Sequence, residues 1–416
     1  MREMRLWPLL ALSVVLLSLP LSAQDWRQFR GPTGQGLAEA DGLPVKWDET
    51  TNVAWKVPVP GLGWSSPVVA HGRVWLTTAV QKGNDDSLRL LSFDNESGRV
   101  RQDVEVFHKT NADLLNPKNS NASPTPIVDD ERVYVHFGSD GTAALTLEGA
   151  LVWKARYTCE TQHGNGGSPV LYEGLLIFTC DGFDAAYVVA LDARTGKQKW
   201  KTTRRQPWSQ AYATPLIIRV GDTDQLVSPA AHYAAAYHPL TGKEIWRVSY
   251  SDGFSNVPRP VFGRGLVVIA TGFQQPSLIA VRPDGTGDLT RTQVVWRLAR
   301  GAPLTPSPIV VGEHLYVVND LGILTCITAE TGAIVWQRRV PGNYSASPVS
   351  AGGVIYVQSE EGVTTVFRPG ATFEAVSVNR LDGAMLASMA VSGRSLFIRS
   401  NDHLYRIAAT PSSVPN

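Results

Sequence analysis

Neither positive nor negative charge is in excess in this sequence. Its 416 residues include 38 Lys or Arg and 37 Asp or Glu, which gives a formal net charge of +1 at pH 7. The sequence has no basic run and no stripe in which basic and aromatic side chains alternate, features typical of nucleic-acid binding. A near-neutral chain also exerts little long-range attraction on a charged partner. We therefore expect no nucleic acid among its partners.

Cysteine is scarce as well. Only Cys159, Cys180 and Cys326 occur, and no two of them are adjacent. Their spacing matches no metal-ligand pattern, so we expect no metal site. An odd number leaves at least one thiol unpaired within a monomer. A Cys159–Cys180 disulfide and three buried free thiols both fit the sequence, and Cys326 has the character of a core thiol within a strand.

The N-terminus carries an apolar run of the targeting type. Arg2 and Arg5 precede the apolar residues 9–17, and Leu21-Ser22-Ala23 comes before Gln24. This pattern predicts a cleaved signal peptide over residues 1–23 and a protein that is periplasmic or on the cell surface. An uncleaved anchor is the alternative, although the run is short for a membrane span. No cysteine follows the run, so the sequence offers no attachment site for a lipid there.

Two short phrases repeat along the rest of the chain. The first is a Thr-Gly turn followed four residues later by Trp, with its clearest copies ending at Trp200, Trp246 and Trp336. The second is a small residue and a proline that open a β-branched run. The second phrase places prolines at Pro67, Pro126, Pro169, Pro215, Pro260, Pro308 and Pro348. From Pro126 onward the steps are 40 to 48 residues, the length of a four-stranded propeller blade.

The repeats predict an all-β fold, an eight-bladed β-propeller of four-stranded blades. A Pro-less copy at 388–391 begins an eighth unit that lacks a fourth strand, whereas residues 52–59 form an orphan strand. Pairing that strand into the last blade closes the ring and removes an exposed edge. The propeller then spans residues 51–410, after an extension at 24–50 and before a tail at 411–416. We expect the repeated Trp side chains to be apolar plugs between blades.

The phrase Asp-x-x-Thr-Gly-x-x-x-Trp, as at 192–200, resembles the PQQ-like β-propeller repeat proteins. That group includes quinoprotein dehydrogenases and the outer-membrane assembly lipoprotein of the β-barrel machinery. The resemblance covers nearly the whole mature chain, and segments 25–32, 119–126 and 342–348 are similar to an exported subgroup. It implies the fold but not the chemistry, because one fold carries many functions.

Two departures separate the chain from the named branches. The dehydrogenases carry adjacent cysteines beside the quinone, and no motif here matches their calcium-binding Glu and Asn or their catalytic Asp. The assembly lipoprotein is tethered through a cysteine that this chain lacks. The resemblance therefore implies a monomeric binding or scaffolding module of the cell envelope, with no cofactor that the residues demonstrate. The alternative is a PQQ-dependent oxidoreductase of the alcohol or sugar dehydrogenase type, which would need PQQ and calcium.

The candidate ligand site is the funnel where loops of different blades converge on the ring axis. Its expected ligand is an envelope protein, a glycan or a small polar organic molecule. The residues assigned to it are aromatic, amide or charged: Trp64, His163, Asn165, Trp208, Gln210, Tyr212, His232, Arg259, Asn319 and Asp320. We expect the polar insertion at 109–121 to arch over it.

Simpler roles are open for several of these residues. Asn319 and Asp320 fit turns, and His163 and His232 fit hydrogen-bonded loop positions, because neither histidine has a partner at a diagnostic spacing. The glycine-rich segments 164–167 and 284–287 lack the strand-to-helix context of a phosphate loop and are expected to be turns. No nucleophile elbow occurs. No catalytic residue is therefore assigned.

Overall fold

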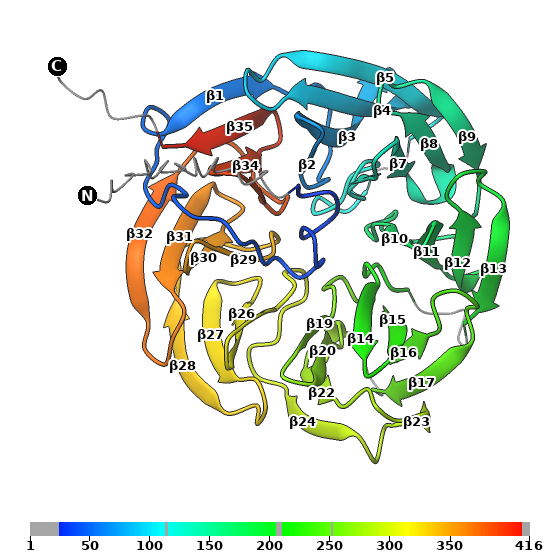
Figure 1. Cartoon of the computed structure of the whole chain (residues 1–416), viewed down its shortest axis with the longest axis vertical. Helices are drawn as coiled ribbons and strands as arrows, with labels where there is room; N and C mark the ends of the chain where they lie inside the picture. The colour runs from blue at the N-terminus through cyan, green and yellow to red at the C-terminus, as the bar shows by residue number, and fades with distance from the viewer. Residues whose placement is uncertain (1–24, 113–114, 205–209, 251–252, 410–416) are drawn as a thin grey trace, which may run out of the picture.

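Eight antiparallel blades surround a central axis in the computed structural model (Figure 1), which describes residues 25–112, 115–204, 210–250 and 253–409. Each blade runs from an inner to an outer strand. Their strands are β2 (Val68–Ala70), β3 (Arg73–Lys82), β4 (Asp85–Asp94) and β5 (Val100–Lys109); β6 (Ile127–Val128), β7 (Arg132–His136), β8 (Thr142–Thr146) and β9 (Leu151–Ala155); β10 (Val170–Tyr172), β11 (Leu175–Asp181), β12 (Ala186–Asp192) and β13 (Gln198–Thr203); β14 (Leu216–Val220), β15 (Thr223–Ala230), β16 (Tyr233–Tyr237) and β17 (Glu244–Ser249); β19 (Val261–Gly263), β20 (Leu266–Ala270), β22 (Leu278–Val281) and β24 (Val294–Leu298); β25 (Ile309–Val311), β26 (His314–Val318), β27 (Ile323–Thr328) and β28 (Ile334–Arg339); β29 (Val349–Ala351), β30 (Val354–Gln358), β31 (Val363–Arg368) and β32 (Glu374–Arg380); and β33 (Ala390–Ser392), β34 (Ser395–Arg399), β35 (His403–Ala408) and β1 (Val53–Pro58). The predicted fold class and blade number are confirmed.

A few short elements lie outside this plan. Strand β23 (Gly287–Asp288) adds a parallel bridge to the outer edge of β17, and β18 (Gly253–Phe254) pairs with β21 (Phe273–Gln274). One turn of 3-10 helix covers Gly138–Asp140. Within the described ranges, no helix is long and apolar enough to cross a membrane.

The ring closes as predicted. Strand β1 pairs antiparallel with β35, with Lys56 opposite Tyr405 and Pro58 opposite His403, so the last blade takes its outer strand from the N-terminal side of the chain. Because the first and last parts of the propeller share one sheet, the ring has no seam along which a blade edge is left bare. The pairing of β1 with β35 therefore holds the ring closed.

The Thr-Gly…Trp repeat is a docking contact between consecutive blades. Trp200 is buried, and its indole N–H donates to the carbonyl of Pro239 in the next blade at 3.0 Å. Its ring covers Gly242, where an added Cβ would lie 2.4 Å from the indole, and Gly242 also has a φ of +70°. Glycine is thus required at position 242 for two reasons: the backbone adopts a left-handed turn, and the neighbouring Trp200 ring fills the space that a side chain would need. The same contact joins Trp55 to Gly98, Trp153 to Gly196 and Trp296 to Gly332.

The other two repeat tryptophans, Trp246 and Trp336, also fill the space between blades, but they contact different partners. Trp246 is completely buried, and its indole N–H donates to Oε1 of Gln225 at 2.7 Å. Trp336 donates to the carbonyl of Gly370 at 3.1 Å. The apolar clusters also draw their members from adjacent blades, so the core lies between blades and not at the axis. The prediction that these tryptophans pack between blades is confirmed.

The second repeat forms a hydroxyl ring around the axis. In six of the eight blades, the residue two positions before the first strand donates its backbone N–H to the Ser or Thr side chain at the same position in the next blade. Six such bonds, at 2.9 to 3.0 Å, run from Ser66 to Thr125, Thr125 to Ser168, Ser168 to Thr214, Arg259 to Ser307, Ser307 to Ser347 and Ser347 to Ser388. In the fifth blade this position is Arg259, whose side chain has no hydroxyl to accept the backbone N–H of Thr214, so the series is interrupted there. Below, these residues are called the hydroxyl ring.

The extension after the signal region crosses the ring centre as a plug, seen as the blue trace in Figure 1. Trp26 is buried and exchanges backbone hydrogen bonds with Val69 of the first blade. Further along, the backbone N–H of Ala38 donates to the carbonyl of Ser350 in the seventh blade. The ring of Trp47 stacks on that of Tyr356, with centroids 6.1 Å apart. The extension is therefore packed onto the first and seventh blades, which are separated by the eighth.

The cysteines divide into one disulfide and one thiol. Cys159 and Cys180 are bonded, which decides between the two arrangements that the sequence left open. Cys326 is a buried free thiol in β27, as expected. Burial raises the pKa of the Cys326 thiol to about 11, so it stays protonated and unreactive at neutral pH.

Deleting residues 52–59 should remove the outer strand of the last blade and expose the edge of β35. We expect loss of cooperative thermal unfolding, or aggregation through the bare edge, because sheet edges pair with one another when uncovered. Circular dichroism and light scattering during heating would measure both. A melting profile equal to that of the parent would contradict the closure role.

Replacing Trp200, Trp246 or Trp336 singly by Ala should lower the free energy of unfolding by about 3 to 5 kcal/mol, since each change opens a cavity between blades. Ile334→Ala is the matched control, because this side chain is 40% exposed on the same strand as Trp336. Denaturant unfolding measures all four variants. Losses below about 1 kcal/mol for the tryptophans would place them outside the packed core.

Candidate functional site

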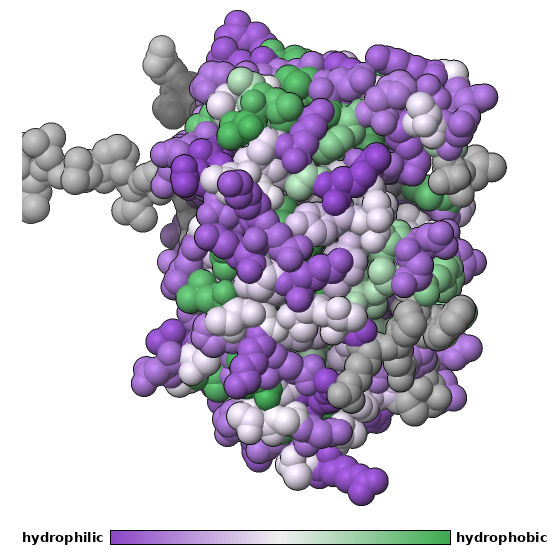
Figure 2. All heavy atoms as spheres, turned by 90° about the vertical axis from the view of Figure 1, so that its right-hand side faces the viewer, coloured by the Kyte–Doolittle hydropathy of each residue, from purple (hydrophilic) through white to green (hydrophobic). Residues whose placement is uncertain are grey.

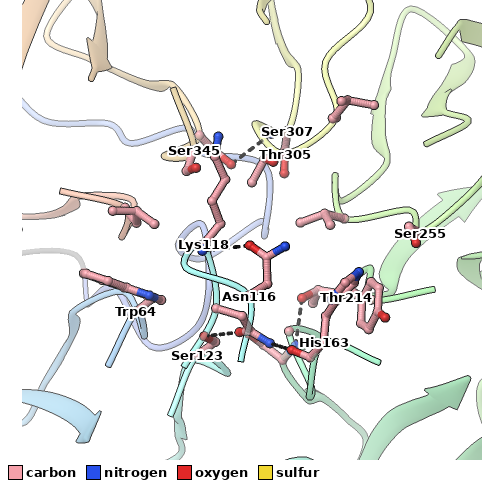
Figure 3. Close-up of a pocket in the computed structure, with 18 of the residues that line it drawn as sticks. Trp64, Asn116, Lys118, Ser123, His163, Thr214, Ser255, Thr305, Ser307 and Ser345 are labelled. Atoms are coloured by element: carbon pink, nitrogen blue, oxygen red, sulfur yellow. Dashed lines mark hydrogen bonds between the residues drawn. The ribbon is translucent and has the colours of Figure 1, made fainter. Parts of the chain in front are cut away.

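A cavity of about 640 Å³ occupies the ring axis (Figure 3). Phe29 of the plug lines one side of it, and the remaining lining residues come from the inner ends of the blades and from the loops that enter them. The hydroxyl ring contributes Ser66, Thr125, Ser168, Thr214, Ser307, Ser347 and Ser388. The cavity is thus a cup, closed by the plug and open towards the loops.

The hydroxyl ring makes the cup wall polar without making it charged. In Ser168, for example, the hydroxyl oxygen accepts the N–H of Thr125, which leaves the O–H proton free to be donated. The side chain orientation is fixed by the bond to the neighbouring blade. The wall therefore presents oriented donors to whatever enters the cup.

Aromatic and apolar side chains line the cup above this ring. Trp64 and Tyr212 come from loops before the first strands of the first and fourth blades, and His163 comes from the loop before the third. The apolar members include Phe254, Val257, Phe273, Leu304 and Leu386. Aromatic faces beside polar groups bind organic ligands and polypeptide segments well.

The 109–121 insertion reaches across the mouth, as the sequence suggested. Lys118 Nζ lies 2.8 Å from Glu360 Oε1 and 3.8 Å from Asp320 Oδ1, which belong to the seventh and sixth blades. Its side chain extends over the cup towards Ser345 in Figure 3. The insertion leaves the first blade, so this contact links opposite sides of the ring.

Lys118 is the charged residue in the described lining of the cup. Among the described lining residues it is the only Lys or Arg, and none of them is Asp or Glu. Asn119 holds the insertion in place, since its amide N–H donates to the carbonyl of His163, while Ser123 donates to Asn119 Oδ1 at 2.5 Å. The Lys118 ammonium is offset by Glu360 and Asp320 at the mouth, so the cup has an ion-paired mouth and a neutral interior.

Three of the ten assigned residues, Trp64, His163 and Tyr212, do line the cup. The Trp64 indole nitrogen is buried and has no hydrogen-bond partner among the described residues. The Tyr212 hydroxyl donates to Gln210 Oε1 at 2.5 Å. Burial raises the pKa of Tyr212 above its ordinary value, so its phenol stays neutral and suits binding better than acid–base chemistry.

Four other assigned residues serve the loops around the cup. Gln210 is buried behind Tyr212, where Oε1 also accepts the N–H of Gln162. The Asn319 side chain accepts the N–H of Ile323 in its own turn, and Asp320 accepts the N–H of Leu304 at 2.7 Å. His232 lies 6.2 Å from Phe254 between ring centroids and is not among the cup's lining residues. Asn319 thus takes the simpler role of a turn residue, whereas Asp320 joins its turn to the loop at Leu304 and lies 3.8 Å from Lys118 Nζ at the mouth.

The last three assigned residues are placed elsewhere. Asn165 lines a smaller neighbouring cavity of about 330 Å³, beside the Cys159–Cys180 disulfide. Arg259 is only 2% exposed and does not reach the cup; its Nε and Nη1 donate to the carbonyls of Pro215 and Phe29. Our placement of Arg259 in the funnel was wrong, because it occupies a hydroxyl-ring position and turns towards the plug. Trp208 lies outside the described residues.

Sequence reasoning missed three parts of the site: Phe29, Lys118 and the hydroxyl ring. The Ser/Thr-Pro phrase was visible, but it was interpreted as a strand start and not as a set of side chains facing the axis. Phe29 and Lys118 carried no repeat signal. Their place depends on how the extension and the insertion cross the ring.

The cup does not match the donor set that calcium with PQQ requires. Calcium prefers carboxylate and carbonyl oxygens, and the described lining residues offer no carboxylate. Within the described ranges, no three His, Cys, Asp or Glu side chains gather closely enough to hold a metal ion. The Cys159–Cys180 disulfide lines the smaller cavity and joins residues 21 apart in sequence.

Comparison with protein families identifies residues 37–228 and 277–383 as matching the family described as "Outer membrane protein assembly factor BamB". A protein of that name from Burkholderia pseudomallei (strain K96243) is 26% identical over 374 residues, covering 77% of this chain and 93% of the relative. A second, from Legionella pneumophila (strain Paris), is 24% identical over 205 residues, covering 46% of this chain. The latter match spans about half the length of the relative, 49%.

Solved structures share the fold at low identity. BamB from Moraxella catarrhalis has a TM-score of 0.61 at 14% identity, covering 88% of this chain and 99% of that one. A europium-containing methanol dehydrogenase has a TM-score of 0.68 at 10% identity, covering 90% and 89%. A quinohemoprotein alcohol dehydrogenase from Comamonas testosteroni has a TM-score of 0.66 at 11% identity, covering 94% and 82%. At these identities the likeness establishes the propeller and not the chemistry.

The wall and the mouth of the cup should respond differently to mutation. Ser168→Ala leaves the buried Thr125 N–H without its acceptor, so we expect a loss of about 1 to 3 kcal/mol in unfolding free energy. Lys118→Ala removes a partly exposed ion pair and should change the unfolding free energy by less than about 1 kcal/mol. Denaturant unfolding measures both. A larger loss for Lys118→Ala than for Ser168→Ala would mean that the mouth, and not the wall, holds the ring together.

Proposed function

Since this chain belongs to the family described as outer membrane protein assembly factor BamB, we propose that it is a protein-binding scaffold of the cell envelope. In this proposal the cup holds an extended segment of an envelope protein. An extended polypeptide carries backbone carbonyls that accept hydrogen bonds along its length, and the cup wall carries a circle of oriented hydroxyl donors. The composition of the cup is the observation that carries the proposal.

The aromatic rim supports a polypeptide partner over a small metabolite. Phe273 is 53% exposed and Val257 is 36% exposed, and Phe254 packs edge-on against Phe273 with ring centroids 5.7 Å apart. Apolar groups at the mouth and hydroxyls below suit a segment with both side chains and a polar backbone. By contrast, the outer wall seen in Figure 2 is mostly hydrophilic, with apolar residues in scattered patches. The mouth is therefore the favoured docking site over the wall in that view.

We propose in addition that the protein is exported across the inner membrane. The signal-type region 1–23 lies outside the described residues, and we propose that its cleavage leaves the extension, the propeller at 51–410 and a short tail. The Cys159–Cys180 disulfide is consistent with an oxidising compartment such as the periplasm. Anchorage to a membrane is not required by the proposal.

A pull-down from envelope extract tests the scaffold function. We expect the tagged mature protein to retain specific envelope proteins, and the double variant Trp64→Ala with Lys118→Ala to lose at least about tenfold in retention, since each removed contact contributes about 1 kcal/mol or more. Val378→Ala is the control, because this side chain is 61% exposed on the outer strand β32. Quantitative mass spectrometry measures retention. Equal retention by parent and double variant would remove the cup from the proposal, and retention of glycan alone would replace the partner class.

A separate measurement addresses the oxidoreductase alternative. We expect PQQ and calcium, added to the purified protein, to produce no bound-quinone absorbance and no reduction of an artificial electron acceptor with alcohols or sugars. The physical reason is the absence of carboxylates among the described lining residues of the cup. Acceptor reduction that requires both PQQ and an alcohol would establish the enzyme and overturn this expectation.

A further inference from the structure

Two arginines meet where the plug docks on the ring. Arg30 belongs to the plug and is 1% exposed; its Nη2 donates to the carbonyl of Gln35 at 2.8 Å and approaches that of Pro348 at 3.5 Å. Its Nε and Nη1 are buried with no hydrogen-bond partner among the described residues. A buried N–H without an acceptor is destabilising, and a charged one more so.

Arg259 approaches the same place from the ring. Its Nη1 donates at 2.7 Å to the carbonyl of Phe29, the residue directly before Arg30. The plug backbone closes over both guanidinium groups: an added Cβ would lie 2.5 Å from Arg259 Nη1 at Gly34 and 2.8 Å from Arg30 Nη2 at Gly36. Water therefore has little access to either group.

Both charges lack a carboxylate. Every hydrogen-bond acceptor that these guanidinium groups reach in the described part of the chain is a backbone carbonyl, and neither arginine forms an ion pair there. Burial, together with the charge of Arg259, lowers the pKa of Arg30 to about 9, and burial lowers that of Arg259 to about 9. Both side chains are consequently protonated at neutral pH, and two like charges share one buried region.

Two other buried guanidinium groups are compensated differently. Arg399 has only backbone carbonyls and the Ser65 hydroxyl as acceptors, and its Nε and Nη2 have no hydrogen-bond partner among the described residues, but it is a single charge, whereas two like charges meet at Arg30 and Arg259. The completely buried side chain of Arg204 forms an ion pair with Asp181 at 2.5 Å between Nη1 and Oδ2. Buried charges are normally paired in this way, because leaving one unpaired is strongly destabilising. The Arg30–Arg259 pair is the arrangement that calls for an added negative charge.

We propose that Arg30 and Arg259 bind a small monovalent anion, chloride or a short carboxylate such as formate, at the junction of plug and ring. The anion accepts hydrogen bonds from the unpartnered Arg30 nitrogens and offsets the repulsion between the two cations. Because one cation comes from the plug and the other from the ring, anion binding stabilises the docked plug. This site lies beneath the cup and is independent of the scaffold function.

Thermal unfolding in different sodium salts at equal ionic strength tests the proposal. With chloride or formate at about 100 times the dissociation constant, we expect a Tm about 3 °C higher than in gluconate, which is too bulky for the site. The chloride and formate arms distinguish the two sources of anion. Identical Tm values in all three salts would overturn the proposal.

Two variants connect the salt effect to this pair. Arg259→Thr removes one cation and supplies a hydroxyl at the position where seven other blades carry Ser or Thr, so the fold should be retained. Arg30→Gln removes the other cation and keeps an amide donor. In both variants the difference between chloride and gluconate should disappear. Arg264→Thr is the control, because Arg264 is exposed and paired with Glu330, and its anion dependence should equal that of the parent.

Crystals grown in bromide locate the ion directly. We expect an anomalous peak in contact with the guanidinium groups of Arg30 and Arg259, and none there in Arg259→Thr crystals. Peaks confined to exposed side chains would mean an adventitious ion only and would contradict the site. If Arg30→Gln fails to fold, the Arg259→Thr crystals and melting curves still decide the question.

Discussion

The hydrogen bonds of the hydroxyl ring are the constraint on which the rest of the structure depends. Each of the six ties the entrance of a first strand to the next blade, so it holds the inner ends of those two blades together. At the outer strands, the contact of Trp with Gly repeats the connection, as with Trp200 and Gly242. With inner and outer ends both linked, the apolar side chains pack as a series of clusters, each shared by neighbouring blades.

The same hydroxyls produce the cup. A propeller needs no side chains at its axis, and here the wall consists of Ser and Thr whose oxygens are already used between blades. The plug then closes one end through Phe29, and the insertion carrying Lys118 reaches over the other. A structural device of the ring thereby becomes a polar surface suited to an extended partner, and the interrupted position at Arg259 becomes the contact with the plug.

The fold is shared by assembly factors and by dehydrogenases, so it cannot separate them. The family match and the chemistry of the cup point in one direction. Oriented hydroxyls and the aromatic side chains of Trp64, His163 and Tyr212 suit binding, whereas a quinone with calcium needs carboxylates that the described lining does not supply. The interblade contacts hold the inner surface in place, so a partner of the proposed kind would meet a preformed cup.

The sequence by itself determined the blade count, the ring closure by residues 52–59 and the burial of Trp200, Trp246 and Trp336, because these follow from local periodicity repeated eight times. It also supplied three cup residues, Trp64, His163 and Tyr212. Only the tertiary structure decided that Arg259 faces the plug, that Cys159 bonds to Cys180, and that Phe29 and Lys118 meet the cup from opposite ends. The physical reason is that blade repeats encode contacts between neighbours, whereas the extension and the insertion cross the axis, and their partners lie up to 356 residues away in sequence.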